Sequence, residues 1–252
     1  MEQKLKFITC SGANEFTNIT DLVTLSEKFP IIEWGIQVSG KKCGQGSERL
    51  AWIQRLHRCL QTDNQKLQMA LHINADWVDG FTAGELSPEL ISLLRLKNIK
   101  NAPFFGRVQL NFKLGRDKIP YLSILMDHMR AYGDDRRFIF SFNEENKEFI
   151  HMLYRKGLRN FDVLYDSSHG EGVSAHEWRA PAFFDYGVLQ GYAGGLSPEN
   201  VTNEVIAIKS VVPYNRSFYI DAEGRLKGDD KHLSLEKCEQ YVVNALKAMS
   251  KI

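Results

Sequence analysis

Short apolar runs alternate with amphipathic segments along the whole chain, and this alternation constrains the fold more than any other feature of the sequence. The runs are rich in β-branched or aromatic residues, and most are too short to be helices, so they predict strands. Eight such runs are found, at residues 6–10, 31–38, 68–73, 107–112, 138–142, 161–166, 186–191 and 217–221.

The segments between these runs carry helical signals. Two of them open with a residue that can cap a helix, then a proline at the first helical position, then an acid, namely Ser87-Pro88-Glu89 and Ser197-Pro198-Glu199. Apolar residues recur at helical spacing in 50–60, 201–212 and 235–249.

Strand and helix signals therefore repeat eight times, which predicts a parallel sheet closed into a (β/α)8 barrel. The chain has 252 residues, the usual size of such a barrel. It contains no long Gly/Pro/Ser-rich linker, so we expect one domain over residues 1–252. An open doubly wound sheet is the structural alternative.

Charge and composition exclude several classes of function. Lys and Arg total 32 and Asp and Glu total 31, so no charge imbalance points to nucleic acid or an anionic membrane. No apolar run reaches the roughly 18 residues of a membrane span, and the N-terminal segment lacks the features of a signal peptide. None of the four cysteines forms a C-x-x-C pair, and no His/Asp/Glu group has metal-site spacing. We therefore expect a cytoplasmic protein with free thiols and neither metal nor cofactor.

In such barrels the site is built where the strands end and by the loops that follow them. The first run ends at Cys10, whose thiol is a general base if its pKa falls, and otherwise a small buried hydrophobe. The sixth run ends at Asp166, a candidate general acid or base whose alternative role is a structural hydrogen bond.

The last two strands are followed by candidate anion sites. Gly194 and Gly195 precede a helix start, where backbone N–H groups can hold a phosphate, although tight turns use the same pattern. The eighth run ends at Asp221, and Arg225 and Lys227 follow it as anion ligands or as a solvated charged turn.

Polar residues also occur within the third and fourth runs. Gln109 and Asn111 are two positions apart and so share one face of a strand, either inside the barrel or toward a ligand. His72 is expected to be a hydrogen-bonded core residue rather than a metal ligand.

The order of these motifs resembles phosphoribosylanthranilate isomerase, a family of tryptophan biosynthesis. That family has a lysine-hydrophobic-Cys-Gly first strand, a Ser-Pro-Arg segment, a Val-Gln-Leu-His fourth strand, an Asp before a glycine-rich loop and a Trp, and an Ala-Gly-Gly-Leu-x-Pro-x-Asn-Val loop. The similar segments here are Lys6 to Gly12, Ser47-Glu48-Arg49, Val108 to Asn111, Asp166 with Gly170-Glu171-Gly172 and Trp178, and Ala193 to Val201.

The resemblance implies an Amadori rearrangement of a phosphoribosyl-arylamine, which is an aldose–ketose isomerisation. It assigns Asp166 as the acid that opens the ribose ring and Cys10 as the base that removes the C2′ proton. It assigns Arg49 to the anthranilate carboxylate. Further substrate contacts are expected from Gln109, Gly170, Gly172 and Asp221, and phosphate contacts from Gly194, Gly195 and Arg225.

The segment after the eighth run departs from the family pattern. The family has Asp followed by a Ser-Ser-Gly-Val-Glu type loop, whereas this chain reads Asp221-Ala222-Glu223-Gly224-Arg225. Glu223 would repel a phosphate dianion. The alternatives are therefore a divergent barrel enzyme acting on another sugar or sugar phosphate, and a barrel that binds a ligand without catalysis. The expected partner is a small molecule, a phosphorylated sugar, with a homodimer as one candidate assembly.

Overall fold

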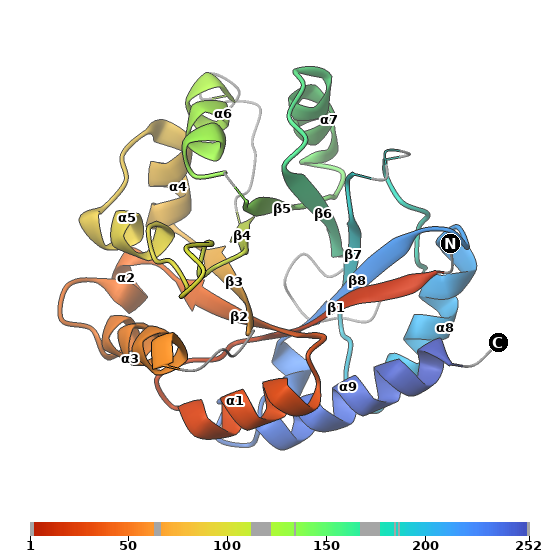
Figure 1. Ribbon diagram of the computed structural model, residues 1–252. Coiled ribbons are helices and arrows are strands. Elements are labelled where there is room, and N and C mark those ends of the chain that lie inside the picture. The colour runs from red at the N-terminus through yellow and green to blue at the C-terminus, as the bar shows by residue number, and fades with distance from the viewer. Residues whose placement is uncertain are drawn as a thin grey trace.

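Eight parallel strands close into a barrel in the computed structural model, which describes residues 3–62, 67–111, 122–133, 135–166, 177–183, 185 and 187–250 (Figure 1). Each strand pairs with the next along the chain, and β8 pairs with β1. The (β/α)8 prediction is confirmed. The strands are β1 (Lys4–Ser11), β2 (Ile32–Val38), β3 (Gln68–Ile73), β4 (Arg107–Leu110), β5 (Arg137–Ser141), β6 (Phe161–Asp166), β7 (Gln190–Ala193) and β8 (Ser217–Ala222).

Helices surround the barrel (Figure 1). The Ser87 side chain caps α5 by accepting from the Leu90 N–H, as its sequence pattern predicts. The described helices are α1 (Ile19–Lys28), α2 (Gly40–Cys43), α3 (Glu48–Thr62), α4 (Asp76–Ala83), α5 (Pro88–Leu94), α6 (Leu122–Ala131), α7 (Lys147–Arg155), α8 (Val201–Val211) and α9 (Leu235–Met249), with a 3-10 turn η2 (Gly224–Leu226).

Most element boundaries agree with the sequence prediction to within two residues, and two differ by three residues or more. The seventh strand begins at Gln190 rather than at 186, because the Asp185 side chain and carbonyl hold Gly187 and Val188 in a turn. Helix α8 begins at Val201 rather than directly after Ser197. In that segment the backbone and side chains of Ser197 and Asn200 bond to each other reciprocally, which makes a separate turn before the helix.

Side chains alternate between the two faces of every strand, because the side-chain period of a strand is two. Those facing outward are mainly apolar and pack against the helices; Trp34 also donates a hydrogen bond to Ser26 of α1 at 2.7 Å. Those facing inward include many polar groups. This pattern separates an apolar layer around the barrel from a polar interior.

One interior layer, near the N-terminal ends of the strands, is built from charged residues of alternate strands. Arg107 of β4 lies 2.9 Å from Glu33 of β2 and 3.3 Å from Asp162 of β6. Its guanidinium stacks 4.0 Å from the ring centre of Tyr219 on β8. Four side chains from alternate strands are the usual layer of such a barrel, but the usual residues are bulky and branched. Here opposite charges fill the space instead.

Candidate active site

The C-terminal ends of the strands carry a hydrogen-bonded pair inside the barrel. Ser11, the last residue of β1, donates a hydrogen bond of 2.7 Å to Asp221 of the neighbouring strand β8. Both side chains are almost fully buried. Strand β8 therefore brings its only carboxylate into the barrel mouth, beside a hydroxyl.

Burial changes the acidity of Asp221. Loss of hydration raises the pKa of its carboxyl from 3.8 to about 7, and the neighbouring carboxylates Glu33 and Glu223 act in the same direction. The hydrogen bond from Ser11 and the positive charge of Arg107 act in the opposite direction but are outweighed. A carboxyl with a pKa near neutrality exchanges protons readily, which is the property of a general acid or base.

His72 of β3 lies beside this pair. A Cβ added at Gly35, on the strand between β1 and β3, would lie 2.4 Å from the Ser11 hydroxyl and 2.8 Å from His72 Cε1. Glycine is therefore required there, since any side chain would displace both groups. Burial lowers the pKa of His72 to about 3, so the ring is neutral at physiological pH. The prediction that His72 is a hydrogen-bonded core residue is only half right, because its buried Nε2 atom has no hydrogen-bond partner among the described residues.

The interior face of β4 carries a second unpartnered acceptor. Gln109 and Asn111 share one face, as their spacing predicts, and the Gln109 amide donates to Asn111 Oδ1 at 2.7 Å. Asn111 in turn donates to Asn74 after β3 at 2.9 Å. Within the described chain, Gln109 Oε1 is buried without a partner, like His72 Nε2 on the adjacent strand. Buried polar atoms are rarely left unpaired, so these two atoms are candidates for contact with a bound polar group.

A chain of hydrogen bonds crosses the rim above β1. Gln37 at the end of β2 donates to Glu223 after β8 at 2.6 Å, and Lys42 donates to Gln37 at 2.6 Å. Lys227 binds the other Glu223 oxygen at 3.0 Å. The negative charge of Glu223 is thus partly compensated, which reduces the repulsion that the sequence suggested.

Asp166 lies at the last position of β6, two residues beyond the inward-facing Leu164, so alternation places its half-buried side chain on the inner face. Its backbone is paired with Ala193 of β7, and Ala193 is paired with Asp221 of β8. The two carboxylates therefore stand on alternate strands of one mouth, with roughly 10 Å between their backbones at about 4.8 Å per strand. The structure thus places Asp166 and Asp221 on the inner face of the same barrel mouth.

Cys10, the predicted base, lies on the opposite face of its strand. Its side chain is fully buried in the apolar layer between the barrel and the helices, within hydrogen-bond range of Cys238 of α9. Burial first, and the contact with Cys238 second, raise the pKa of the Cys10 thiol well above its ordinary value. The prediction that Cys10 and Asp166 meet in the mouth is wrong, and Cys10 is a small buried hydrophobe.

Ser11 takes the place that Cys10 was expected to fill, and the sequence contained a signal for it. In the resembling family pattern the cysteine directly precedes the glycine, and here the residue directly before Gly12 is Ser11. Aligning on the glycine rather than on the cysteine would have put Ser11 on the inner face. His72 and Gly35 had no comparable signal.

Arg49 lies at the rim, as expected, but its guanidinium is engaged within the protein. It forms an ion pair with Glu15 and donates to the Gln37 carbonyl at 2.9 Å. It is also largely buried, with 11% of its side chain exposed. Arg49 therefore positions the end of β2, and holding a substrate carboxylate would require displacing Glu15. Gly170 and Gly172 lie outside the described residues.

The loop after β7 has the backbone expected of an anion site. Gly194 and Gly195 adopt φ angles of 116° and 63°, which L side chains rarely adopt. Asn200 fixes the loop by donating to the Gly195 carbonyl at 2.9 Å. In this loop, hydrogen bonds from Ser197 and from the backbone lower the pKa of Glu199, and the charges of Lys237 and Arg225 add to the effect. Arg225 is exposed.

The described residues contain neither a metal-binding cluster nor a membrane-spanning helix. No group of three or more His, Cys, Asp or Glu side chains there could hold a metal ion. None of the described helices is both long and apolar enough to cross a membrane.

Comparison with known proteins gives structural matches alone. No family model matches the chain, and no curated protein matches its sequence. TrpF from Jonesia denitrificans aligns over 97% of this chain and 98% of its own, with 12% identity and a TM-score of 0.57. Phosphoribosyl anthranilate isomerase from Thermotoga maritima aligns over 96% of this chain and 100% of its own, with 13% identity and a TM-score of 0.54.

A protein of different chemistry matches almost as well. A glycoside hydrolase family 30 xylanase from Clostridium acetobutylicum aligns over 97% of this chain and 71% of its own, with 9% identity and a TM-score of 0.52. Fold does not fix function when such different enzymes share it. At these identities the likeness establishes one thing: this chain has the (β/α)8 barrel fold.

Proposed function

We propose that this protein is an isomerase that carries out an Amadori-type rearrangement of a small phosphorylated aldose derivative by acid–base catalysis. The observation that carries the proposal is the buried Asp221 carboxyl, held by Ser11 inside the barrel mouth with a pKa of about 7. Such a group can accept a proton from carbon and release it again near neutral pH.

Two carboxyls divide the work in this proposal. Asp166 donates a proton to the ring oxygen of the sugar as the ring opens. Asp221, as the carboxylate, then removes the proton from C2 of the open-chain imine. The protonated Asp221, after exchange with solvent, returns a proton to C1 of the enolamine, and the enol hydroxyl loses its proton to water to give the ketone. Ser11 orients Asp221 throughout, and the unpartnered atoms of His72 and Gln109 bind sugar hydroxyls.

The phosphate would lie at the loop after β7. Gly194 and Gly195 allow close approach of the backbone, and the α8 N-terminus follows. Arg225 would contribute charge from the neighbouring strand end. The proposed reaction is of the isomerase type named for the structurally similar TrpF.

The test uses hydrogen exchange with solvent. The purified protein is incubated in D2O with ribose 5-phosphate and anthranilate, which condense to the arylamine substrate. Proton NMR should show one deuterium at C1 of the ketose product. Asp221→Asn should slow this by about 10²–10⁴-fold, whereas Asp229→Asn, at an exposed position, should not.

Replacing ribose 5-phosphate with ribose tests whether the protein recognises the phosphate group of the substrate. Turnover that is equal with both sugars would remove the phosphate from the proposal. No incorporation by folded wild-type protein, or full activity of Asp221→Asn, would refute the isomerase assignment.

A further inference from the structure

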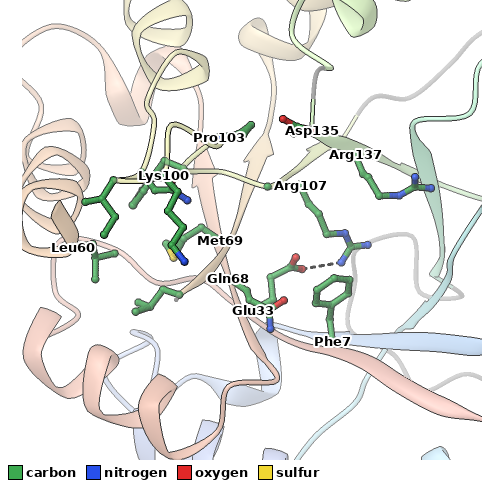
Figure 2. Close-up of a pocket in the computed structure, with 15 residues that line it drawn as sticks. Phe7, Glu33, Leu60, Gln68, Met69, Lys100, Pro103, Arg107, Asp135 and Arg137 are labelled. Carbon is green, nitrogen blue, oxygen red and sulfur yellow. Dashed lines mark hydrogen bonds and ion pairs between the residues drawn. The ribbon is translucent and has the colours of Figure 1, made fainter. Parts of the chain in front are cut away.

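A cavity of about 350 Å3 opens at the end of the barrel opposite Asp221. Its lining includes Gln68, Arg107 and Arg137, which are the first residues of their strands, and it is therefore at the N-terminal end. Figure 2 shows Leu60, Lys100 and Met69 toward one side of it and the Glu33–Arg107 pair toward the other. The proposed isomerase site does not use this cavity.

The walls of the cavity are mostly apolar, and the polar lining residues outside the Glu33 network include one cation and one anion, Lys100 and Asp135. The apolar walls come from α3, from β3 and from the segment between α5 and β4, and they are formed by Leu60, Leu67, Met69, Ile99, Pro103 and Phe104. Ile99 is 47% exposed and contributes accessible apolar surface to the cavity. A cavity of this volume can enclose a small ring compound, and small-molecule sites in proteins are mostly apolar with few polar groups.

The inner end of the cavity presents a carboxylate with one unused oxygen. Both hydrogen bonds that described residues make to Glu33 end on its Oε1 atom, from Thr9 at 2.9 Å and from Arg107 at 2.9 Å. Oε2 accepts none from that part of the chain. Glu33 is 1% exposed and lines the cavity, so bulk water hydrates it poorly. A ligand that donates to Oε2 would complete its hydrogen bonding.

The charges around Glu33 already balance. Arg107 lies between Glu33 and Asp162, and Arg137 also binds Asp162 at 2.7 Å. Two guanidinium groups thus face two carboxylates. An additional buried charge would have no counter-ion in this network and would lose its hydration. The chemistry favours a neutral donor over an ammonium or a carboxylate.

We infer that this cavity is a second binding site, which takes a small neutral molecule with an aromatic or branched aliphatic body and one hydroxyl. The body contacts Leu60, Met69 and Phe104, and the hydroxyl donates to Glu33 Oε2. The inference is independent of the isomerase proposal, because it uses the opposite end of the barrel.

Three probes of similar size separate the contributions. They are p-cresol, toluene, which lacks the hydroxyl, and benzoate, which is charged. Binding to the full-length protein is measured by saturation-transfer NMR with titration. We expect p-cresol to bind with a Kd of about 1 mM, as a ligand of so few atoms can. Toluene should bind about tenfold more weakly, because it makes no hydrogen bond to a charged acceptor.

A cavity-filling variant locates the site. Gly106 lines the cavity, and a Cβ there meets no atom within 4 Å, so Gly106→Leu should fold and fill the space. Gly224→Leu is the matched control, because it is equally open and lies at the other end of the barrel. Circular dichroism confirms that each variant is folded.

Loss of p-cresol binding in Gly106→Leu, with retention in Gly224→Leu, supports the site. Absence of p-cresol binding to wild-type protein overturns it, as does equal binding by both variants. Binding of toluene or benzoate as tightly as p-cresol overturns the assigned chemistry. The wild-type comparison among the three probes stands even if Gly106→Leu does not fold.

Discussion

The Asp221 carboxyl is buried at a position where its ionisation opposes folding. Burial raises its pKa from 3.8 to about 7, a difference of about 3 units. Each unit corresponds to about 1.4 kcal/mol, so the charged carboxylate costs the folded state up to about 4 kcal/mol. Asp221→Asn removes this cost, because the amide does not ionise and its oxygen can still accept the hydrogen bond from Ser11.

The sign of the effect follows from proton binding. Between about pH 4 and pH 7 the folded protein holds a proton on Asp221 that the unfolded chain has released. Stability therefore decreases as pH rises through this window and is level above it. The variant should match wild type near pH 4 and exceed it by up to about 4 kcal/mol near pH 8.

Urea denaturation of both proteins near pH 4, 6 and 8 measures this directly. Titrating groups distant from Asp221 are present in both proteins, so their contributions largely cancel in the difference, whereas Glu33 and Glu223 interact with Asp221 and contribute to it. Asp229→Asn is the control at an exposed position, and its free energy of unfolding should change with pH in the same way as that of wild type. The claim that Asp221 is buried with a raised pKa would be refuted if the unfolding free energy of Asp221→Asn followed that of wild type at every pH. It would also be refuted if the variant were less stable than wild type near pH 8. The gain in stability with loss of activity is the trade-off expected of a functional residue.

Three further predictions follow from packing. Cys59 is the one exposed cysteine of four, so a thiol reagent should label a single site quickly in native protein and four after denaturation. Arg107→Met should destabilise by about 3–5 kcal/mol in urea unfolding, because it leaves the buried Glu33 carboxylate without its counter-ion, whereas Asp162 keeps Arg137. Gly191→Ala should cost about 1–3 kcal/mol, since its Cβ would lie 2.0 Å from Tyr219 Cζ, whereas Gly106→Ala, in open space, should change stability by less than about 0.5 kcal/mol. Equal effects of the two glycine changes would contradict the described packing.

The positions of the strands were predictable because hydrophobic periodicity is a local property. A run such as 31–38 needs only its own residues to show that it is a buried strand. The boundary of β7 was not predictable, since Gly187 and Val188 are held in a turn by Asp185, and Arg216 from before β8 also binds the Asp185 and Val188 carbonyls.

The candidate site was predicted in part for the same reason. Asp166 and Asp221 could be placed at strand ends, where barrels carry their sites. Whether Cys10 or Ser11 faces inward depends on register, and a shift of one residue reverses every side chain of a strand. Local sequence leaves that choice open when polar and apolar residues are mixed, as in Thr9-Cys10-Ser11.

The sequence by itself determined the barrel and the strand ends that carry acids, because apolar periodicity and chain order act over a few residues. Tertiary structure alone decided which neighbours Asp221 has, and therefore its pKa, since Ser11 is 210 positions away in the chain. It also decided that Glu33, Arg107 and Asp162 meet at the inner end of a cavity. Desolvation and charge pairing depend on distances in space, which only the closed barrel fixes.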